Sequence, residues 1–585
     1  MTASSRASLM RDSRSPFSRP AEDHITAKKT RPVANNMTFP PGMLFRSTIA
    51  EASKSLPMFV PLTPIRCLHR AMDVFPEKTG VVCDDKRFTY ARFGERCEKL
   101  ATALIAEGVQ PGDRVAFLSF NNHQLLEGYF GVPQARAVLM PLNVRLSQPE
   151  LTAILNHSGA SVLIFESEFA PLVEQLRPQC PSIRRYVTIG ESMAVADINY
   201  EELLAQGYAE RADVFTIDEN SIAELFYTSG STGTPKGVTL SHRTLYLHAI
   251  SVSVCLRQSP VAVELHTIPL FHANGWGKAQ ACTLLGITQV MVRRFEPALV
   301  LRLIEEHGAT GMCLVPTMAQ ALLNAPGLAD ADLSSLQTVM IGGAASSPEL
   351  IERLEKALHC ECMAGYGLTE TSPVLTISTA KHGSYASDEE RWRRQAMAGW
   401  PIVGCTVRVV DLHMNDVPRD GKSIGEIVAM GDQVMEGYYA EPQATSAVMT
   451  GPWLHTGDMA VWDEESYIQI VDRSKEIIIS GGENISSLEV EKAIYAHNGV
   501  LECAVVAAPD EKWGEVPVAI VLRKPGVALT AEELMDFLSS RLGRFKLPRA
   551  VEFREEPLPK TGTGKIRKID LREKYWQGRE RRVHG

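Results

Sequence analysis

One stretch of this chain, residues 227–238, restricts its fold and its chemistry more than any other. It reads Tyr-Thr-Ser-Gly-Ser-Thr-Gly-Thr-Pro-Lys-Gly-Val. The glycines Gly230, Gly233 and Gly237 allow backbone N–H groups to turn toward an anion. Lys236 adds a cation, and hydroxyl side chains add further donors; they are Thr228, Ser229, Ser231, Thr232 and Thr234. These features predict a loop that holds phosphate groups.

The segments on either side help to place this loop. The apolar residues 222–227 are typical of a strand, and Ser241 followed by apolar residues is typical of a helix start. Anion sites often form between a strand and a helix. The spacing differs from that of the common nucleotide hydrolases, because Lys236 is followed by Gly237 rather than by Ser or Thr. A flexible surface loop rich in Ser and Gly is the structural alternative.

The pattern along the chain predicts an α/β fold, with a large N-terminal domain followed by a small α+β domain. Strand-like and helix-like segments alternate up to about residue 410, which favours layered subdomains with largely parallel sheets. Residues 425–437 and 457–471 are typical of hairpin strands and predict a small β unit. The expected boundaries are 1–42 for a disordered tail, 43–474 for the large domain, 475–572 for the small domain and 573–585 for a basic tail.

The composition excludes several classes of partner. With a net charge of -9 over 585 residues, the chain has no general attraction for nucleic acid or for an anionic membrane. No apolar run reaches the length of a bilayer span, so we expect no integral membrane segment. The eleven cysteines lack metal-ligand spacing, which favours a reduced, cytoplasmic protein. Arginines among the N-terminal serines leave an organelle transit peptide as an alternative, and a homodimer is also left open.

A second motif, residues 365–371, reads Gly-Tyr-Gly-Leu-Thr-Glu-Thr. The ring of Tyr366, beside Gly367, is able to stack on a purine base. The Thr369 hydroxyl is able to contact a phosphate oxygen, and Glu370 offers carboxylate oxygens to Mg²⁺. A plain surface turn is the alternative.

Several weaker motifs have ordinary structural explanations when each is taken alone. A tight turn, a packed histidine, a turn-closing aspartate and a solvated arginine would account for them. They are Gly343-Ala344 after an apolar run, His272 and Trp276 within residues 269–276, Asp458 at the end of residues 453–458, and Arg473 in a charged segment.

Taken together and in this order, the motifs resemble those of the adenylate-forming enzymes, a group that includes acyl-CoA synthetases, luciferases and carrier-loading adenylation domains. The resemblance covers about residues 62–572 and is strongest toward the short- and medium-chain fatty acyl-CoA ligases. It implies that ATP phosphates bind the loop of residues 228–236. The other implied contacts are Tyr366 and Gly367 at the adenylate, Thr369 at the α-phosphate, Glu370 on Mg²⁺, Gly343 and Ala344 near the adenine, Asp458 and Arg473 on the ribose, and His272 and Trp276 at the acyl pocket.

The resemblance also assigns roles within the small domain. Lys475 is the implied hinge. Lys565, in the sequence Pro-Lys-Thr-Gly-Thr-Gly-Lys-Ile, is the implied catalytic lysine. The implied path of the CoA thiol is lined by Ser480, Gly481, Gly482 and Glu483. A Gly-rich turn and a solvated basic segment are the structural alternatives.

The implied reaction joins a carboxylic acid to coenzyme A. ATP activates the acid as an acyl-adenylate with release of pyrophosphate, and the CoA thiol then displaces AMP. Mg²⁺, Lys236 and Lys565 would supply the positive charge that two reacting anions require. We expect ATP, Mg²⁺ and CoA to bind, and the substrate to be a short- to medium-chain fatty acid. Long-chain, aromatic or methylthiopropionate acids, and the loading of a carrier protein, are the alternatives.

Overall fold

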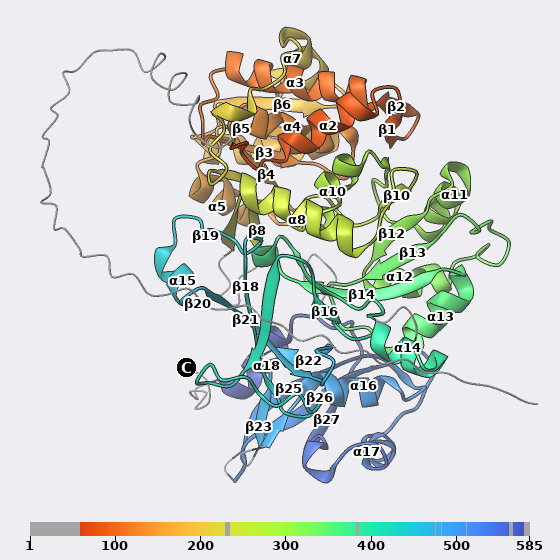
Figure 1. Cartoon of the computed structure of the whole chain (residues 1–585). Coiled ribbons are helices and arrows are strands. Elements are labelled where there is room, and N and C mark those ends of the chain that lie inside the picture. Colours follow the sequence, from red (N-terminus) through yellow and green to blue (C-terminus); the bar gives the residue numbers. More distant parts are fainter. Residues whose placement is uncertain are drawn as a thin grey trace, which may run out of the picture. The chain divides into compact units, whose positions relative to one another are not determined.

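The computed structural model describes residues 59–228, 235–381, 385–473, 476–480, 483–510, 512–560 and 566–577, without the side chains of residues 473, 479, 483, 484 and 545. Within these residues the strands form two large and two small sheets (Figure 1). In the same parts of the chain, none of the helices combines the length and the hydropathy that a bilayer span requires. The predicted layered α/β architecture is confirmed, while the four predicted boundaries stay predictions.

The first large sheet contains the strands on both sides of the predicted phosphate loop. Its eight strands follow the order β19, β9, β8, β4, β3, β5, β6, β7. Their bounds are β3 (Arg114–Leu118), β4 (Val138–Pro141), β5 (Val162–Glu166), β6 (Arg185–Ile189), β7 (Ile198–Asn199), β8 (Ile222–Thr228), β9 (Lys236–Ser241) and β19 (Gly437–Tyr438). Neighbouring strands from β8 to β7 run parallel, and β9 and β19 join one edge in antiparallel pairs.

The second large sheet supplies the strand ends on which the other motifs lie. Its nine strands follow the order β16, β15, β14, β13, β12, β10, β11, β1, β2. Their bounds are β1 (Thr79–Cys83), β2 (Lys86–Thr89), β10 (Val263–His266), β11 (Thr288–Met291), β12 (Gly311–Leu314), β13 (Thr338–Ile341), β14 (Glu361–Gly367), β15 (Val374–Ile377) and β16 (Trp400–Pro401). From β1 through β14 the strands pair in parallel, as expected for alternating strands and helices.

Helices connect most of these parallel strands. Two of them begin where the sequence provides a capping side chain: Asn122 accepts from Leu125 N at 2.8 Å, and Ser241 accepts from Thr244 N at 3.2 Å. The helices of the large domain include α2 (Ile65–Val74), α3 (Tyr90–Ala106), α4 (His123–Gln134), α5 (Gln148–Ser158), α6 (Ala170–Leu176), α7 (Tyr200–Gln206), α8 (His242–Cys255), α10 (Lys278–Leu285), α11 (Pro297–His307), α12 (Pro316–Leu323), α13 (Pro348–Leu358) and α14 (Asp388–Gln395).

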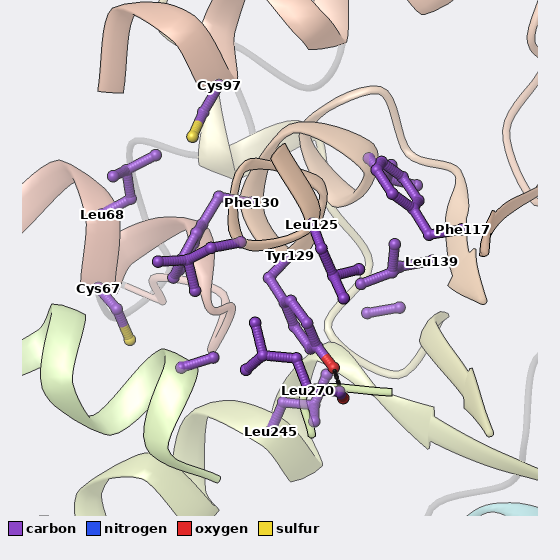
Figure 2. Packing of buried hydrophobic residues seen from close by; sticks show 14 of the residues in the cluster. Cys67, Leu68, Cys97, Phe117, Leu125, Tyr129, Phe130, Leu139, Leu245 and Leu270 are labelled. Atoms are coloured by element: carbon purple, nitrogen blue, oxygen red, sulfur yellow. Dashed lines mark hydrogen bonds between the residues drawn. The ribbon is translucent and has the colours of Figure 1, made fainter. Parts of the chain in front are cut away.

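Helix α4 lies at the centre of the largest hydrophobic core. All of its residues are buried, which is typical of a helix that has no solvent-facing side. Figure 2 shows Tyr129 and Leu125 of this helix beside Phe117 and Leu139 from the first sheet. The Tyr129 hydroxyl donates to the backbone oxygen of Leu270 at 2.6 Å. The core therefore packs the first sheet against the segment of residues 269–276.

The two smaller sheets follow in sequence. The first contains β17 (Cys405–Val410), β18 (Gly425–Gly431), β20 (Met449–Thr450), β21 (Trp453–Trp462) and β22 (Ile468–Arg473). The second contains β23 (Ile478–Ser480), β24 (Glu483–Ile485), β25 (Val500–Asp510), β26 (Gly514–Arg523) and β27 (Ala550–Arg554), with helices α16 (Ser487–Tyr495), α17 (Ala531–Ser539) and α18 (Lys568–Trp576).

Residues 425–437, predicted as part of the small β unit, divide between two sheets. Strand β18 belongs to the small sheet, as expected, whereas Gly437 begins β19 and pairs with Thr239 of the first large sheet. This division makes β19 the edge strand beside β9, and it brings Tyr438 to the candidate site.

Candidate active site

Strands β8 and β9 bring the two ends of the predicted phosphate loop together. Thr228, the last residue of β8, pairs with Lys236, the first residue of β9. The loop residues Ser229, Gly230, Ser231, Thr232, Gly233 and Thr234 lie outside the described residues. The predicted helix start at Ser241 is confirmed, but β9 separates it from the loop. The loop therefore joins two antiparallel strands and does not lie at a helix N-terminus as the sequence suggested.

Tyr438, which the sequence analysis did not select, lies beside Lys236. The Lys236 ammonium is 4.8 Å from the centre of the Tyr438 ring, a cation–π distance. The Tyr438 hydroxyl donates to Glu370 Oε1 at 2.9 Å. Burial, and then the neighbouring Glu370 charge, raise the pKa of Tyr438, so its hydroxyl keeps its proton. The aromatic pair that follows Gly437 was the available signal in the sequence.

Glu370 and Thr369 lie half-buried in the short turn η4 (Thr369–Thr371), just after β14. The backbone oxygen of Glu370 accepts from Met435 N at 2.9 Å, which ties this turn to the segment leading into β19. Among the described residues, no three His, Cys, Asp or Glu side chains gather as metal ligands. A single carboxylate nevertheless fits Mg²⁺, because this ion keeps several waters and takes its other oxygens from substrate phosphates.

Tyr366 and Asp458 form a second pair. The Tyr366 hydroxyl donates to Asp458 Oδ2 at 2.7 Å, although 92 residues separate them in the sequence. Asp458 is only 3 % exposed, and it faces Arg473 across the register of β21 and β22. A buried carboxylate with two acceptor oxygens suits a donor pair such as the ribose hydroxyls. The structure thus brings together two residues that the sequence predicted for the same nucleoside.

Two predicted nucleotide-binding glycines have different structural settings. A Cβ on Gly367 would lie 1.7 Å from the backbone oxygen of Pro373, so no side chain fits there. Gly343 and its neighbour Ala344 are exposed and follow the end of β13, as the sequence predicts for an open strand end. Gly367 therefore allows a close approach within the protein, whereas Gly343 presents open backbone.

Trp276 and Val315 lie against this open backbone. A Cβ on Gly343 would be 3.6 Å from Trp276 Cζ2 and 3.2 Å from Val315 Cγ1. The Trp276 side chain is buried, whereas His272 is exposed. Surrounding protein desolvates the His272 ring and lowers its pKa, and the Arg145 charge adds to this effect. The predicted position of His272 at the acyl pocket stays a prediction.

The backbone that presents Trp276 is a left-handed turn. The φ angles are 45° at Ala273, 44° at Asn274, 58° at Gly275, 62° at Trp276 and 76° at Gly277. Left-handed backbone costs about 1–2 kcal/mol for each residue with a side chain. The Asn274 side chain accepts from Gly277 N and thereby supports the turn. The Asn-Gly pair was the sequence signal for it.

The predicted residues of the small domain are only partly described. Lys475, Gly481, Gly482 and Lys565 lie outside the described residues. Ser480 ends β23 and pairs with Glu483 at the start of β24, so these two backbones form a hairpin. The structure places no predicted small-domain side chain beside Glu370 or Asp458 within the part that it describes. Their roles therefore stay predictions.

The fold has two large sheets connected by helices. Its site combines a hairpin whose second strand begins at a lysine with a tyrosine–aspartate pair. These features define a class of α/β enzyme whose site suits a nucleotide. Residues 68–439 match the AMP-binding enzyme family, and residues 489–565 match the C-terminal domain of AMP-binding enzymes. The chain belongs to the AMP-binding enzyme family.

Several named proteins are similar to this chain. A long-chain-fatty-acid–CoA ligase of Thermus thermophilus is 40% identical over 87% of this chain and 94% of its own length. A peroxisomal butyrate–CoA ligase of Arabidopsis thaliana is 37% identical over 88% of this chain and 93% of its own length. Among solved structures, an anthranilate CoA ligase in complex with anthranoyl-AMP superposes with a TM-score of 0.79 at 26% identity, over 89% of this chain and 98% of that one.

Proposed function

We propose that this protein is a carboxylic acid–CoA ligase that activates short- to medium-chain fatty acids with ATP. The arrangement that carries the proposal is the contact of Tyr438 with both Lys236 and Glu370. It places a cation over the ring of Tyr438 and a carboxylate suited to Mg²⁺ at its hydroxyl group, and a triphosphate needs both. The names of the CoA ligases that are similar to this chain support the same chemistry.

In the first half-reaction, a carboxylate oxygen of the acid attacks the α-phosphorus of ATP, and the bond to pyrophosphate breaks. Lys236 would hold the leaving phosphates, and the Thr369 hydroxyl would contact the α-phosphate. Glu370, oriented by Tyr438, would hold Mg²⁺, which when bound neutralises phosphate charge. Tyr366 and Asp458 would fix the nucleoside, so that the α-phosphate lies in line with the acid.

In the second half-reaction, the CoA thiol attacks the acyl carbon, and the bond to AMP breaks. The loop containing Lys565 would first leave the site, by a movement of the small domain about Lys475. The hairpin of residues 480–483 would then line the path of the thiol. A mobile domain that serves two chemistries at one acyl pocket is consistent with catalytic gating by domain motion.

The position of Trp276 supports a short acyl chain. Its indole lies against Gly342 and Gly343, since a Cβ on Gly342 would be 3.0 Å from Trp276 Cη2. A buried indole at this strand end fills space that a longer chain would require. A long-chain substrate is the second candidate, favoured by the 40% identical relative from Thermus thermophilus.

Pyrophosphate release from MgATP tests the proposal, measured with acids from acetate to palmitate, together with cinnamate and methylthiopropionate, each with and without CoA. We expect a CoA-dependent maximum at a short or medium chain, with acyl-CoA as the product. A maximum at palmitate selects the long-chain candidate. Pyrophosphate release with CoA present but without a thioester would contradict the ligase proposal and point to a carrier protein as acceptor.

A cytoplasmic location is also part of this proposal. The name of the Arabidopsis thaliana relative places that protein in peroxisomes, which offers the alternative. Fractionation of cells that express the full chain distinguishes the two locations. A peroxisomal protein would sediment with organelles, whereas a cytoplasmic protein would stay in the supernatant.

A further inference from the structure

A cavity of about 400 Å³ lies in the first large sheet, apart from the candidate active site. Arg114, Val138 and Ile222, which line it, are the first residues of β3, β4 and β8. Because these strands are parallel, the three residues lie at the same end of the strands, where each strand begins. Thr228, after which the predicted phosphate loop begins, lies at the opposite end of β8. The cavity is therefore separate from the proposed ATP and acyl positions.

The lining of this cavity is apolar in its interior and cationic at its opening. Apolar side chains and one aromatic ring form most of the surface; they are Pro111, Val138, Ile217, Ile222, Leu225 and Tyr439. Arg114 and Arg136 also line it, and Arg136 is exposed. An apolar recess with cations at its opening favours a molecule with a hydrocarbon body and one anionic head.

The two arginines differ in their surroundings. The Arg114 guanidinium donates to the backbone oxygens of Ser158, Gly112 and Gly159 at 2.6, 2.7 and 2.8 Å, which fixes its position but leaves its charge unneutralised. The side chain of Arg136 forms no hydrogen bond or ion pair with any described residue. A cation that has no partner in the described protein is available to an anionic ligand.

The other ionisable groups of the lining do not cancel this charge. Burial lowers the pKa of His242 to about 4, so its ring is neutral near pH 7. The His242 ring is also held by Thr63, whose hydroxyl lies 2.9 Å from Nδ1. Asp218 is the one carboxylate among the lining residues, against two arginines. The lining as a whole thus carries a net positive charge.

Two residues that line the cavity lie next to residues of the candidate active site. Tyr439 directly follows Tyr438, and its backbone N–H donates to Gly237 O at 2.7 Å. A Cβ on Gly237 would lie 3.0 Å from Leu225 Cδ1 and 3.2 Å from Tyr439 Cβ. Two side chains that line the cavity therefore pack against the residue next to Lys236, and a ligand that shifts them would shift the start of β9.

We propose that this cavity is an effector site for a small amphipathic anion, an alkyl chain with one anionic head, and that its occupation changes the affinity of the active site for ATP. The alkyl chain lies over Val138, Ile222 and Leu225, and the head pairs with Arg136. The regulatory part rests on the proposed ligase function, whereas binding to the cavity does not.

Octanesulfonate is a suitable probe, because its sulfonate cannot be converted to a thioester. Calorimetric titration of the full chain should show one saturable site. Arg136→Ala should weaken binding about tenfold, as expected for the loss of one charge-assisted contact. Ile222→Trp should abolish binding by filling the cavity. Arg257→Ala is the matched control, since Arg257 is also exposed and also has a left-handed backbone, with φ 49° against 57° at Arg136.

The second measurement is the KM for ATP at saturating acid. Octanesulfonate should change it about fivefold or more in the native protein and in Arg257→Ala, but not in Ile222→Trp. Absence of calorimetric binding, or binding that Arg136→Ala and Ile222→Trp leave unchanged, would overturn the site. Binding that is lost in both variants but leaves the KM for ATP unaltered would overturn the regulatory role alone. If the protein has no ligase activity, calorimetric titration still tests whether the cavity binds octanesulfonate.

Discussion

Tyr438 makes two contacts that bear on the same step of the proposed chemistry. Its ring faces Lys236 and its hydroxyl donates to Glu370, so a single side chain positions a cation and a carboxylate. Neither contact depends on local sequence, because β19 reaches β9 from a distant part of the chain. Tyr438 is therefore a residue of the candidate site that the structure reveals and the local sequence does not.

Tyr438→Phe should lower kcat/KM for pyrophosphate release about 10- to 100-fold, because a hydrogen bond to a charged group contributes about 1.5–3 kcal/mol. The requirement for Mg²⁺ should rise as well, since Glu370 loses the donor that orients it. Activity measured over a range of Mg²⁺ concentrations tests this. The control is Tyr575→Phe, which removes the same kind of contact, from Tyr575 to Glu552, in the C-terminal sheet region. Equal effects of the two substitutions would contradict a specific role for Tyr438.

Glu224, a buried residue of β8, should make stability depend on pH. Burial raises the pKa of its carboxyl from 4.5 to about 8, against the opposing hydrogen bond from Gln280. The folded state therefore keeps a proton that the unfolded state has lost above pH 4.5 or so. The stability due to this proton is complete below the unfolded pKa and is lost as pH rises toward about 8.

Glu224→Gln removes this titration while keeping the shape of the side chain and its contact with Gln280, which is 2.6 Å in the native protein. Urea unfolding from about pH 5 to about pH 8.5 should show a falling free energy of unfolding in the native protein and a shallower fall in the variant. Parallel pH profiles would show that Glu224 is not the titrating group.

The left-handed turn of residues 273–277 positions the buried Trp276 side chain on a strained backbone. The turn places Trp276 against Gly343, and His272 directly precedes it. Strained backbone persists only where surrounding structure holds it. Here Asn121 holds the preceding segment, donating to the backbone oxygens of His266 and Ile268 at 2.8 and 3.0 Å. The acyl pocket would thus have a rigid wall.

Gly277→Ala should destabilise the protein by about 2 kcal/mol more than Gly308→Ala. Both glycines have positive φ, 76° and 60°, so both substitutions carry the backbone cost. A Cβ on Gly277 would also lie 2.3 Å from His248 Cε1, whereas a Cβ on Gly308 meets nothing within 4 Å. Urea unfolding of both variants measures the difference. Equal losses would show that the His248 ring moves aside without cost.

Most strands and helices of this fold were predictable from the sequence, because their apolar periodicity is local. Residues 222–227 were predicted as a strand and form β8 from Ile222 to Thr228. The strand β9 was missed, because its six residues follow a Gly-rich loop and become a strand only by pairing with β8. Tyr438 and the left-handed turn were missed for the same physical reason, since tertiary contacts and not local propensity determine them.

In the whole molecule, alanine substitutions of Lys560 and Lys565, two lysines of one motif, should affect the reaction differently. Lys565→Ala should lower adenylate formation about 100-fold or more, by removing positive charge from the reacting phosphate, while thioester formation from supplied acyl-AMP is largely retained. Lys560→Ala is the control, because Lys560 is already paired with Glu502. Single-turnover assays of the two half-reactions separate these effects. Equal loss of both half-reactions in Lys565→Ala would contradict the proposal that Lys565 acts in adenylate formation and not in thioester formation.

The pairing of β19 with β9 also bears on how the protein is synthesised. The Thr239 hydroxyl donates to Gly437 O across 198 residues of sequence. At ribosomal rates of about 5–20 residues per second, the edge of β9 stays unpaired for roughly 10–40 s while the intervening chain is made. An open strand edge is a template for aggregation. The hairpin of β8 and β9 therefore keeps an open edge during this period, and the pairing that closes the edge also brings Tyr438 to Lys236.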